Sequence, residues 1–572
     1  MKIGILQIFN SQRLMVIVLA MLGFGLFDVN ATIINVNSII SLQNAINAAQ
    51  PGDVIVLANG HYADNSIDLS KSNITVKAAT SGGVFLDGYN SIVLSGNNST
   101  VSGFQFTANY TMAGNTFDVY GNGNTITEMN FNGYSADKFI QISGKDNVVS
   151  YCNFQNKLCD VTTSKSGTGD MVQILPNASY VGNNVIKYCS FQHIPGLGGD
   201  FGNECIRIGN SSYSKMISRT VVEYCYFEDT GLGDSEAISV KSKENILRYN
   251  TMNNNKDAMF VFRNGDNNVA YGNFFINSGG IRVKEANNIF CYNNYFEKSG
   301  ATGSMNAVSY IYDTSNTTYV LDNVNFIHNT FVDCGLIDFG GVGATNGTWA
   351  NNIFKKTGSI FINPNAGTTF KGNIYTGTLG MTIPIGMTST DPKLALNSYG
   401  YYGLSASSPA IGTASNEYPS LLNIPGVDTL LLDIMGHSRP VSRLQKDVGC
   451  QQFNSSGLVT NRPLKLTDVG PSYLSQQSAV VQVMQDDFRL SAFHGSTSDI
   501  VILKYALKHD SKVSVCIYNL QGLLVKQLIS GELQQSGVHS CSFNKANFQK
   551  GTYLVRLVTE NGSKTIKFII GS

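Results

Sequence analysis

The chain has 572 residues, with 39 basic and 39 acidic side chains and therefore no formal net charge. This balance excludes a globally basic nucleic-acid binder and a globally acidic tail protein. Apolar residues make up 42% of the chain and charged residues 14%, against about 25% in typical domains, so a large core can form and disorder is excluded. The 57 glycines beside 12 prolines indicate many turns between short strands.

The N-terminus has the pattern of a secretory signal peptide. Lys2 and Arg13 are basic, residues 14–27 are an apolar run, and Val29-Asn30-Ala31 is a small-residue cleavage site. The run is shorter than the roughly 20 residues that a transmembrane helix needs. We expect residues 1–31 to be removed on export, the alternative being a buried core helix. No later stretch is long and apolar enough to span a membrane.

The first element after this segment is an amphipathic helix. Apolar residues recur at helical spacing within residues 41–50, Ser41 is a candidate N-cap, and Pro51 ends the helix before a strand that begins at Val54. A helix in front of a repeat array is suited to cap its open end.

An internal repeat follows. It is a four-residue pattern that usually ends in an aromatic residue, with a base period of 21–25 residues and three intervals of 36 or 37, and it ends at Phe106, Phe131, Phe154, Phe191, Phe227, Met252, Phe274, Tyr295, Phe331, Phe354 and Tyr375. Such a period without helical periodicity or a leucine ladder predicts a solenoid with three short strands per coil. The long intervals predict loops at residues 155–180, 192–215 and 297–322, on the face that solenoids often use for binding.

The cysteines fit the same repeat. Cys152, Cys189 and Cys225 recur in one context, Tyr-Cys-x-Phe, and no Cys or His cluster has zinc spacing. We therefore expect mostly free thiols packed in the core. The sequence leaves open whether Cys516 and Cys541 pair.

The chain divides into four segments. After the signal peptide, residues 32–455 form the solenoid domain with an irregular end, and the Ser/Gln-rich residues 456–483 are a predicted linker. Residues 484–572 have the alternating pattern of a small β-sandwich, with Asn561-Gly562 as a hairpin signal.

The solenoid resembles polysaccharide lyase family 6, which includes alginate lyases and chondroitinase B. The resemblance covers roughly residues 33–453 and depends on the segments 203–209, 233–242, 263–265 and 279–282. It implies an all-β domain, a right-handed single-stranded parallel β-helix, in agreement with the repeat. Residues 517–522 and 551–555 resemble the C-terminal sorting domain of the type IX secretion system, which implies that this machinery exports the protein to the cell surface or the medium.

The resemblance also implies a reaction, β-elimination next to a uronic acid. A base removes the proton at C5 and the bond from C4 to its oxygen breaks. The family's catalytic base matches Lys241, and the arginine at the leaving oxygen matches Arg263. The family's Arg-His-Gly is Arg263-Asn264-Gly265 here. Because the interval from Lys241 to Arg263 is close to one coil, we expect the two to stack on one face.

The resemblance further implies a Ca²⁺ site, since calcium prefers oxygen ligands. Asp234 and Glu236 are two apart, so on a strand they point to one side, and they match the family's acidic pair with Asp in place of one Glu. Asn203 is the candidate amide ligand, and Glu204 is the alternative. Arg282, which falls close to one coil beyond Arg263, and His193 are candidates for substrate binding. Taken alone, each of these charged residues is better explained as a solvated surface group, and it is the joint register with the family's motifs that favours a site.

The sequence thus predicts a secreted lyase that acts on an anionic polysaccharide, with alginate favoured over dermatan or chondroitin sulfate because of the breadth of the family. Two other classes stay open. A β-helix glycoside hydrolase needs converging carboxylates, and the repeat shows no Asp-Asp motif of that kind. A non-catalytic glycan-binding surface protein would use the solenoid face alone.

Overall fold

The computed structural model describes residues 31–107, 109–158, 169–195, 203–230, 236–255, 257–301, 306–313, 315, 318–341, 345–427, 430–440, 446–454, 459–474, 488–494, 500–507, 510–519, 523–535, 537–559 and 562–570. The chain forms two compact units, residues 1–475 and 476–572. In the described residues no helix has the length and apolarity to cross a membrane. The predicted signal peptide lies outside the described residues except for Ala31.

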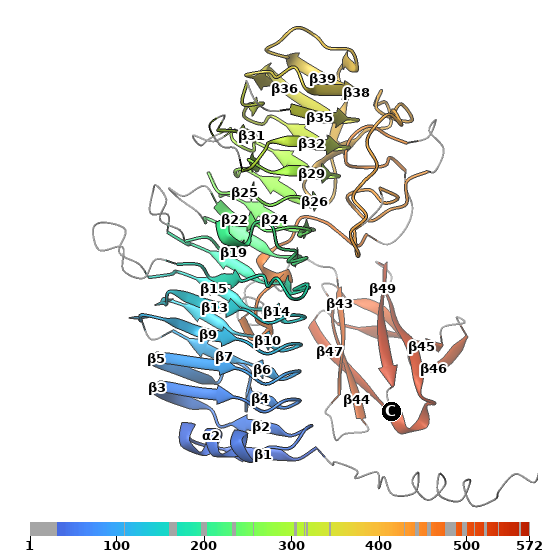
Figure 1. The fold of residues 1–572 in the computed structure, drawn as a ribbon. Helices are drawn as coiled ribbons and strands as arrows, with labels where there is room; N and C mark the ends of the chain where they lie inside the picture. Colours follow the sequence, from blue (N-terminus) through green and yellow to red (C-terminus); the bar gives the residue numbers. More distant parts are fainter. Residues whose placement is uncertain are drawn as a thin grey trace, which may run out of the picture. The chain divides into compact units, whose positions relative to one another are not determined.

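The first unit is a parallel β-helix, as predicted (Figure 1). One wall is a parallel sheet of 14 strands, one from each coil. Its strands, in spatial order, are β1 (Ile33–Val36), β2 (Val54–Leu57), β4 (Thr75–Ala78), β6 (Thr100–Ser102), β10 (Thr125–Thr127), β14 (Val148–Ser150), β17 (Val185–Lys187), β20 (Val221–Glu223), β23 (Ile246–Arg248), β26 (Asn268–Tyr271), β29 (Asn287–Tyr292), β32 (Asp322–Ile327), β35 (Thr345–Ala350) and β38 (Thr368–Lys371).

A second parallel sheet of 24 strands supplies the other strands of the coils, except in the first coil, where helix α2 (Ile39–Ala48) lies between β1 and β2. The strands that follow the first wall are β7 (Phe104–Phe106), β11 (Asn130–Asn132), β15 (Asn153–Gln155), β18 (Ser190–Gln192), β21 (Tyr226–Glu228), β24 (Thr251–Asn253), β27 (Phe274–Ile276), β30 (Tyr295–Glu297), β33 (Thr330–Val332), β36 (Ile353–Ser359), β39 (Asn373–Thr378) and β40 (Met387–Ser389). The strands that close the coils are β9 (Asn115–Val119), β13 (Lys138–Ile142), β16 (Val172–Ile174), β19 (Ile206–Gly209), β22 (Glu236–Lys241), β25 (Met259–Arg263), β28 (Ile281–Lys284), β31 (Val308–Ile311), β34 (Ile337–Asp338) and β37 (Phe361–Ile362). The long strands β3 (Gly60–Leu69) and β5 (Val84–Leu94) complete the first coils, and β8 (Tyr110–Thr111) pairs with β12 (Tyr134–Ser135) at their edge.

Aromatic rings stack inside the coils at the predicted period. Phe131, Phe154 and Phe191 are paired in register, with ring centroids 5.2 and 4.9 Å apart. The predicted positions Phe274 and Tyr295 are wrong by one residue. The structure continues the interior column with residues 275 and 296, and packs Phe274 and Tyr295 outside the coil against Tyr401. Both neighbouring residues are aromatic, so the sequence pattern alone does not separate them.

Buried asparagines fix this register. The side-chain oxygen of Asn273 accepts the backbone N–H of Asn250, at 3.0 Å, and Asn294 does the same for Asn273. The ladder continues through Asn329, Asn352 and Asn373. Each asparagine thus satisfies a buried backbone donor of the preceding coil, which would otherwise cost free energy.

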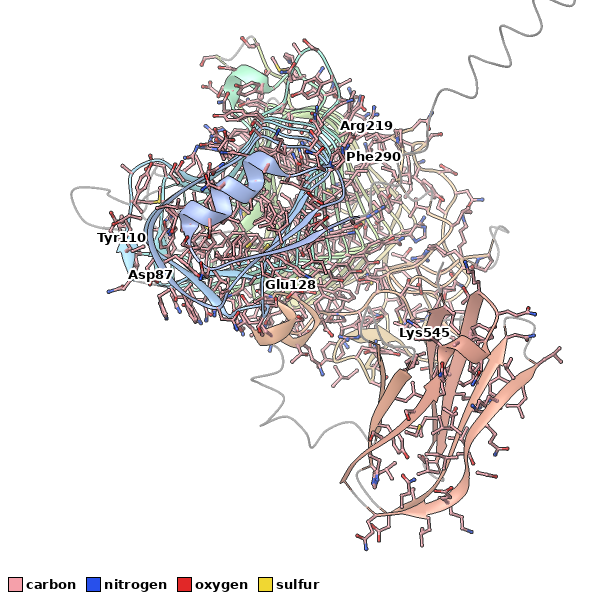
Figure 2. All side chains as sticks on the ribbon, turned by 90° about the horizontal axis from the view of Figure 1, so that it is seen from below. Asp87, Tyr110, Glu128, Arg219, Phe290 and Lys545 are labelled. Atoms are coloured by element: carbon pink, nitrogen blue, oxygen red, sulfur yellow. The ribbon has the colours of Figure 1, made fainter. Side chains whose placement is uncertain are left out.

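The N-terminal helix caps the solenoid, as predicted. Helix α2 (Ile39–Ala48) buries Leu42 and Ile46 and lies across the end of the coils, as the view along the axis in Figure 2 shows. The expectation that Ser41 is the N-cap is wrong, because Ser38 is the N-cap and Ser41 completes a capping box three residues later. The sequence analysis missed that Ser38 stands three residues before Ser41, which is the spacing of a capping box.

The region after the repeat packs along the outside of the coils. β41 (Leu394–Leu396) pairs antiparallel with β42 (Tyr402–Leu404), and η3 (Leu466–Asp468) follows further on. Asn461 donates to the carbonyl of Gly272, and the N–H of Gly470 donates to the carbonyl of Tyr188. Residues 459–474, within the predicted linker 456–483, therefore belong to the first unit. They lack the repeat pattern, so only these long-range contacts reveal the packing.

The described cysteines are all free, in agreement with the prediction of core-packed thiols. Cys152, Cys189 and Cys225 are fully buried on successive coils. Cys516 and Cys541 do not pair, and they lie on strands of different sheets in the second unit. Burial raises the pKa of the Cys541 thiol to about 11.

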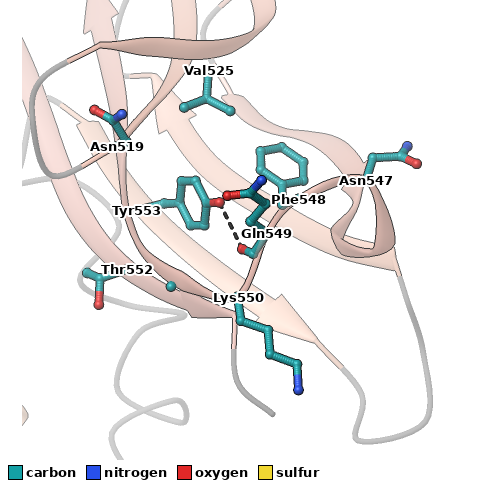
Figure 3. Close-up of a pocket in the computed structure, with 9 residues that line it drawn as sticks. Asn519, Val525, Asn547, Phe548, Gln549, Lys550, Thr552 and Tyr553 are labelled. Carbon is teal, nitrogen blue, oxygen red and sulfur yellow. Dashed lines mark hydrogen bonds between the residues drawn. The ribbon is translucent and has the colours of Figure 1, made fainter.

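The second unit is the predicted β-sandwich. Its first sheet contains β43 (Phe488–His494), β44 (Ile500–Leu507) and β47 (Gly537–Asn544), and its second β46 (Leu524–Gln534), β45 (Ser511–Asn519), β48 (Gly551–Thr559) and β49 (Gly562–Ile570), with η4 (Lys545–Asn547) between them. Val513, Val515 and Ile517 are fully buried. A pocket lies beside β48, where the Tyr553 hydroxyl donates to the carbonyl of Gln549 at 2.8 Å (Figure 3).

A buried histidine makes stability dependent on pH. Burial, followed by the positive charges of Arg439 and Lys446, holds the pKa of His328 well below its usual value. The unfolded chain binds a proton near pH 6.5 that the folded chain does not bind, so stability is complete above that pH and falls as pH drops below it. The neighbouring coils have an asparagine, Asn293 or Asn351, at the position equivalent to His328, with a similar positive φ. The substitution His328→Asn therefore removes the imidazole and suits the backbone at this corner. We expect the loss in urea midpoint between about pH 8 and about pH 5 to shrink. The exposed His61→Asn is the control, and an equal loss in His328→Asn and wild type would contradict the assignment.

Candidate active site

One face of the β-helix gathers charged side chains. We call it the charged face and define it as the outward side of strands β16, β19, β22, β25, β28 and β31. Lys241 is partly exposed between the buried residues Val240 and Ser242, and in β28 buried residues alternate with partly exposed ones. Since parallel coils lie about 4.8 Å apart, outward residues at the same register form columns along the axis.

Lys241 and Arg263 lie next to each other in such a column. Val240 pairs with Phe262 on the adjacent coil, and the two basic residues come directly after this pair. Both are partly exposed, whereas Val240 and Phe262 are fully buried. The structure therefore brings Lys241 and Arg263 together on one face, as the sequence analysis expected. Among the described residues, no hydrogen bond or ion pair engages the Lys241 ammonium group.

The next residue in this column is Lys284, which pairs with Arg263. Arg282 pairs instead with Val261 and Ser309, so it lies in the adjacent column of the same face. The sequence analysis placed Arg282 one coil beyond Arg263, and the coil is correct. The register differs by two positions, because the full coil after Arg263 ends at Lys284.

Carboxylates line the other end of the same strands. Glu236 is 7% exposed, and its Oε1 lies 3.5 Å from Nη1 of Arg263. Glu204 stands two residues before Ile206, which pairs with Ile238, so Glu204 and Glu236 occupy equivalent positions on successive coils. Asp170 holds the same position one coil earlier, two residues before Val172. The three carboxylates thus form a buried acidic column beside the basic one.

Arg207 lies between two of these carboxylates, those of Asp170 and Glu204. Its Nη2 lies 2.7 Å from Oδ2 of Asp170, which is 1% exposed, and its Nη1 lies 4.0 Å from Oε1 of Glu204. Burial, and next the negative charge of Asp170 and a hydrogen bond to it, raise the pKa of Glu204 to about 8. Since one guanidinium faces two buried carboxylates, a further cation would relieve the remaining repulsion.

The acidic column fits a cation that prefers oxygen ligands. Oε2 of Glu236, Oε2 of Glu204 and Oδ1 of Asp170 are buried, and no hydrogen-bond donor in the described residues reaches them. Such atoms are costly unless a donor or a cation engages them. Among the residues that the structure describes, no three carboxylate, imidazole or thiol groups converge as a complete metal site. Asp234, the other predicted acidic ligand, lies outside the described residues.

Asn203 and His193 have structural partners. Oδ1 of Asn203 accepts the N–H of Gly169 at 3.0 Å, and its amide donates to the carbonyl of Pro195 at 2.8 Å. The exposed imidazole of His193 is paired with Asp229 at 2.9 Å, at the corner before the loop to β19. Glu204, the alternative to Asn203, has the unengaged oxygen.

Asn264 forms part of a turn and does not point out from the charged face. It has φ +62°, in the left-handed region that asparagine tolerates, and its buried amide donates to Oε2 of Glu285 at 3.2 Å. Gly265 follows because a Cβ there would lie 2.2 Å from the carbonyl oxygen of Ser242. The Arg263-Asn264-Gly265 segment is thus the tight corner that presents Arg263.

Sequence reasoning did not assign Asp170, Arg207 or Lys284 to the site. Their distances along the chain from Lys241 differ because the insertions have different lengths. The signal was the register of Ile206-Arg207-Ile208 with Ile238-Ser239-Val240, which places Arg207 in the column of Arg282.

These features define a parallel β-helix whose outer face pairs a basic column with a buried acidic one, an arrangement suited to a polymer that carries acid groups. The chondroitinase B family model matches residues 36–392, so the chain belongs to this family of polysaccharide lyases. The model of the secretion system C-terminal sorting domain matches residues 497–571, which identifies the β-sandwich as an export domain.

Solved structures share the fold. The family 6 alginate lyase AlyGC has a TM-score of 0.61 and 22% identity over 77% of this chain. A family 6 alginate lyase in complex with a trisaccharide has a TM-score of 0.54 and 18% identity over 66% of this chain. A mannuronic acid specific family 6 lyase from human gut microbiota has a TM-score of 0.53 and 21% identity over 63% of this chain. The matches cover 59% of the AlyGC chain and 91% of each of the other two. No curated protein matches.

The Arg207 cluster predicts an unequal response to two arginine substitutions. Arg207→Ala leaves Asp170 and Glu204 without their cation, so we expect a loss of about 3–5 kcal/mol in the free energy of unfolding. Arg462→Ala, which breaks a more exposed pair with Asp468, is the control and should cost about 0–1 kcal/mol. Urea denaturation measures both, and Asp170→Asn in the Arg207→Ala background should recover part of the loss. Equal effects at Arg207 and Arg462 would contradict this account.

Proposed function

We propose that the protein is a secreted polysaccharide lyase that cleaves a uronic-acid polymer, alginate first, by β-elimination. The observation that carries the proposal is the placement of Lys241 and Arg263 on adjacent coils with Glu236 beside Arg263. Membership of the chondroitinase B family supports the reaction class. The alginate and mannuronate lyases among the structures of the same fold favour alginate.

In this mechanism Lys241 in its neutral form removes the C5 proton of the uronate. The electron pair of the broken C5–H bond forms the C4–C5 double bond as the bond from C4 to the glycosidic oxygen breaks. Arg263 stabilises the negative charge on that oxygen, which takes up a proton. The products are an unsaturated uronate at one new end and a hydroxyl at the other. Positioned acid–base groups of this kind contribute about 10²–10⁴-fold to a rate.

Calcium is part of the proposal. Glu236 and Glu204 would hold it with their unengaged oxygens, together with Asp234, and Asn203 would supply an amide oxygen after releasing Gly169. When bound, Ca²⁺ supplies positive charge that neutralises the substrate carboxylate and stabilises the charge developing next to it. Arg282 and His193 remain proposed contacts for substrate acid groups.

Dermatan sulfate is the second candidate substrate, because the matching family model is that of chondroitinase B. A panel of alginate, polymannuronate, polyguluronate, dermatan sulfate and pectin, assayed by absorbance of new double bonds, distinguishes the two. It also separates a lyase from a glycoside hydrolase or a glycan-binding module, neither of which creates a double bond.

Removing the base tests the mechanism. We expect Lys241→Ala to lower kcat on the best polymer by about 10²–10⁴-fold, because the next amine in the column, Lys284, lies on the far side of Arg263. Lys187→Ala, on the opposite sheet, is the control and should retain wild-type kcat. A Lys241→Ala enzyme with full activity would reject the assignment.

Removing the cation tests the calcium site. We expect chelation to lower activity and added Ca²⁺ to restore it. Ca²⁺ should also raise the melting temperature of the wild type by mass action, and Glu236→Gln should abolish that rise. If neither the melting temperature nor the activity changed on chelation, calcium would have no part in the mechanism.

A further inference from the structure

Two loops from distant coils meet beside the charged face. Residues 210–219 follow β19 and contain η1 (Ser211–Tyr213), and residues 318–321 precede β32. The hydroxyl of Tyr319 lies 3.0 Å from Oγ of Ser214, which is 2% exposed, and donates to the carbonyl of Ser211 at 3.4 Å. Three coils, those of β22, β25 and β28, lie between the two loops. We call this pair of loops the loop bridge.

Two lysines, Lys215 on the first loop and Lys243 on the turn next to it, face one acidic side chain. Nζ of Lys215 lies 4.9 Å from the ring centroid of Tyr319 and 4.0 Å from Oδ2 of Asp266. Nζ of Lys243 lies 3.6 Å from the same oxygen. Two cations thus share one carboxylate, and the side chain of Lys215 is 58% exposed. An ion pair so long and so exposed is weak, so Lys215 is available to another anion.

The bridge is attached to the turns behind the basic column. The N–H of Lys243 donates to the carbonyl of Met216, and the N–H of Ser218 donates to the carbonyl of Lys243. Lys243 follows Lys241 by two residues, beyond the bend at buried Ser242, and both lysines are partly exposed.

The chain segment after β31, which precedes the second loop, is held near Arg263. Oε1 of Glu285 accepts the N–H of Asp313 at 3.3 Å, and Oε2 of Glu285 accepts the amide of Asn264 at 3.2 Å. Glu285 is 5% exposed, so these two hydrogen bonds are shielded from solvent. The first loop is therefore hydrogen-bonded to the turn after Lys241, and the segment before the second loop is linked through Glu285 to the turn after Arg263.

We propose that the loop bridge is a substrate-binding wall. Lys215 and Lys243 bind the acid group of a sugar unit next to the one that is cleaved, and Tyr319 is the positioning residue that holds Lys215 over the turns. This inference rests on the proposed function, since it assigns a contact to the same polymer. It gives the enzyme a preference for substrates with charge on consecutive units.

The test compares KM and kcat on the polymer that the substrate panel identifies. We expect Lys215→Ala/Lys243→Ala to raise KM about five- to tenfold with kcat changed less than about twofold. The rise of KM with salt should also be flatter than in the wild type, because fewer charges are screened. Tyr319→Ala should raise KM about two- to fivefold, and Tyr319→Phe, which keeps the ring over Lys215, should stay closer to wild type. Lys77→Ala and Tyr399→Ala, exposed residues away from the bridge, are the controls.

The outcomes separate this proposal from the proposed function. A wild type that forms no double bond on any polymer overturns the proposed function. In that case polymer binding by affinity electrophoresis still tests the bridge, with Lys241→Ala compared with Lys241→Ala/Lys215→Ala/Lys243→Ala. Equal binding, or an active Lys215→Ala/Lys243→Ala enzyme with the KM and salt dependence of the wild type, overturns the wall.

Discussion

The hydrogen bonding of each coil to the next is the constraint on which the structure depends. Buried asparagines such as Asn273 and Asn294 accept backbone donors of the preceding coil, so a coil cannot shift along its neighbour without leaving a buried N–H unpaired. A slip by one residue would also turn every outward side chain inward. The same restraint that stabilises the interior therefore holds Lys241 and Arg263 at equivalent positions outside.

This restraint explains how a neutral chain can present a strongly charged surface. The basic residues of the charged face stand one coil apart, close enough to repel one another. The acidic column at the start of the same strands offsets them, through the contacts of Arg207 with Asp170 and of Arg263 with Glu236. Net charge is zero over the chain, yet positive and negative charge gather at opposite ends of the same strands. An anionic chain therefore meets positive charge at the basic column without an overall basic protein.

The fold was predictable from the sequence, because the interior repeats: strand length, turn and aromatic column all have one period. The stacking of Lys241 with Arg263 was predictable for the same reason, since the interval between them is one coil without an insertion. Asp170 and Arg207 were not identified, because insertions of unequal length separate them from Lys241. The shift from Phe274 to residue 275 shows the other limit, since two adjacent aromatic residues satisfy the pattern equally and only packing against Tyr401 distinguishes them.

The insertions that obscure the period also give the face its chemistry. A solenoid coil has no freedom in its interior, because each residue there touches the coil above and the coil below. Its corners are free, so a loop inserted at a corner changes what lies beside the strand ends without disturbing the stack. Ser214 and Tyr319 show the consequence, since two such loops from coils far apart in sequence meet over three short turns. In this chain the repeat places Lys241 and Arg263 on one face, and the corner loops add contacts that the repeat alone does not supply.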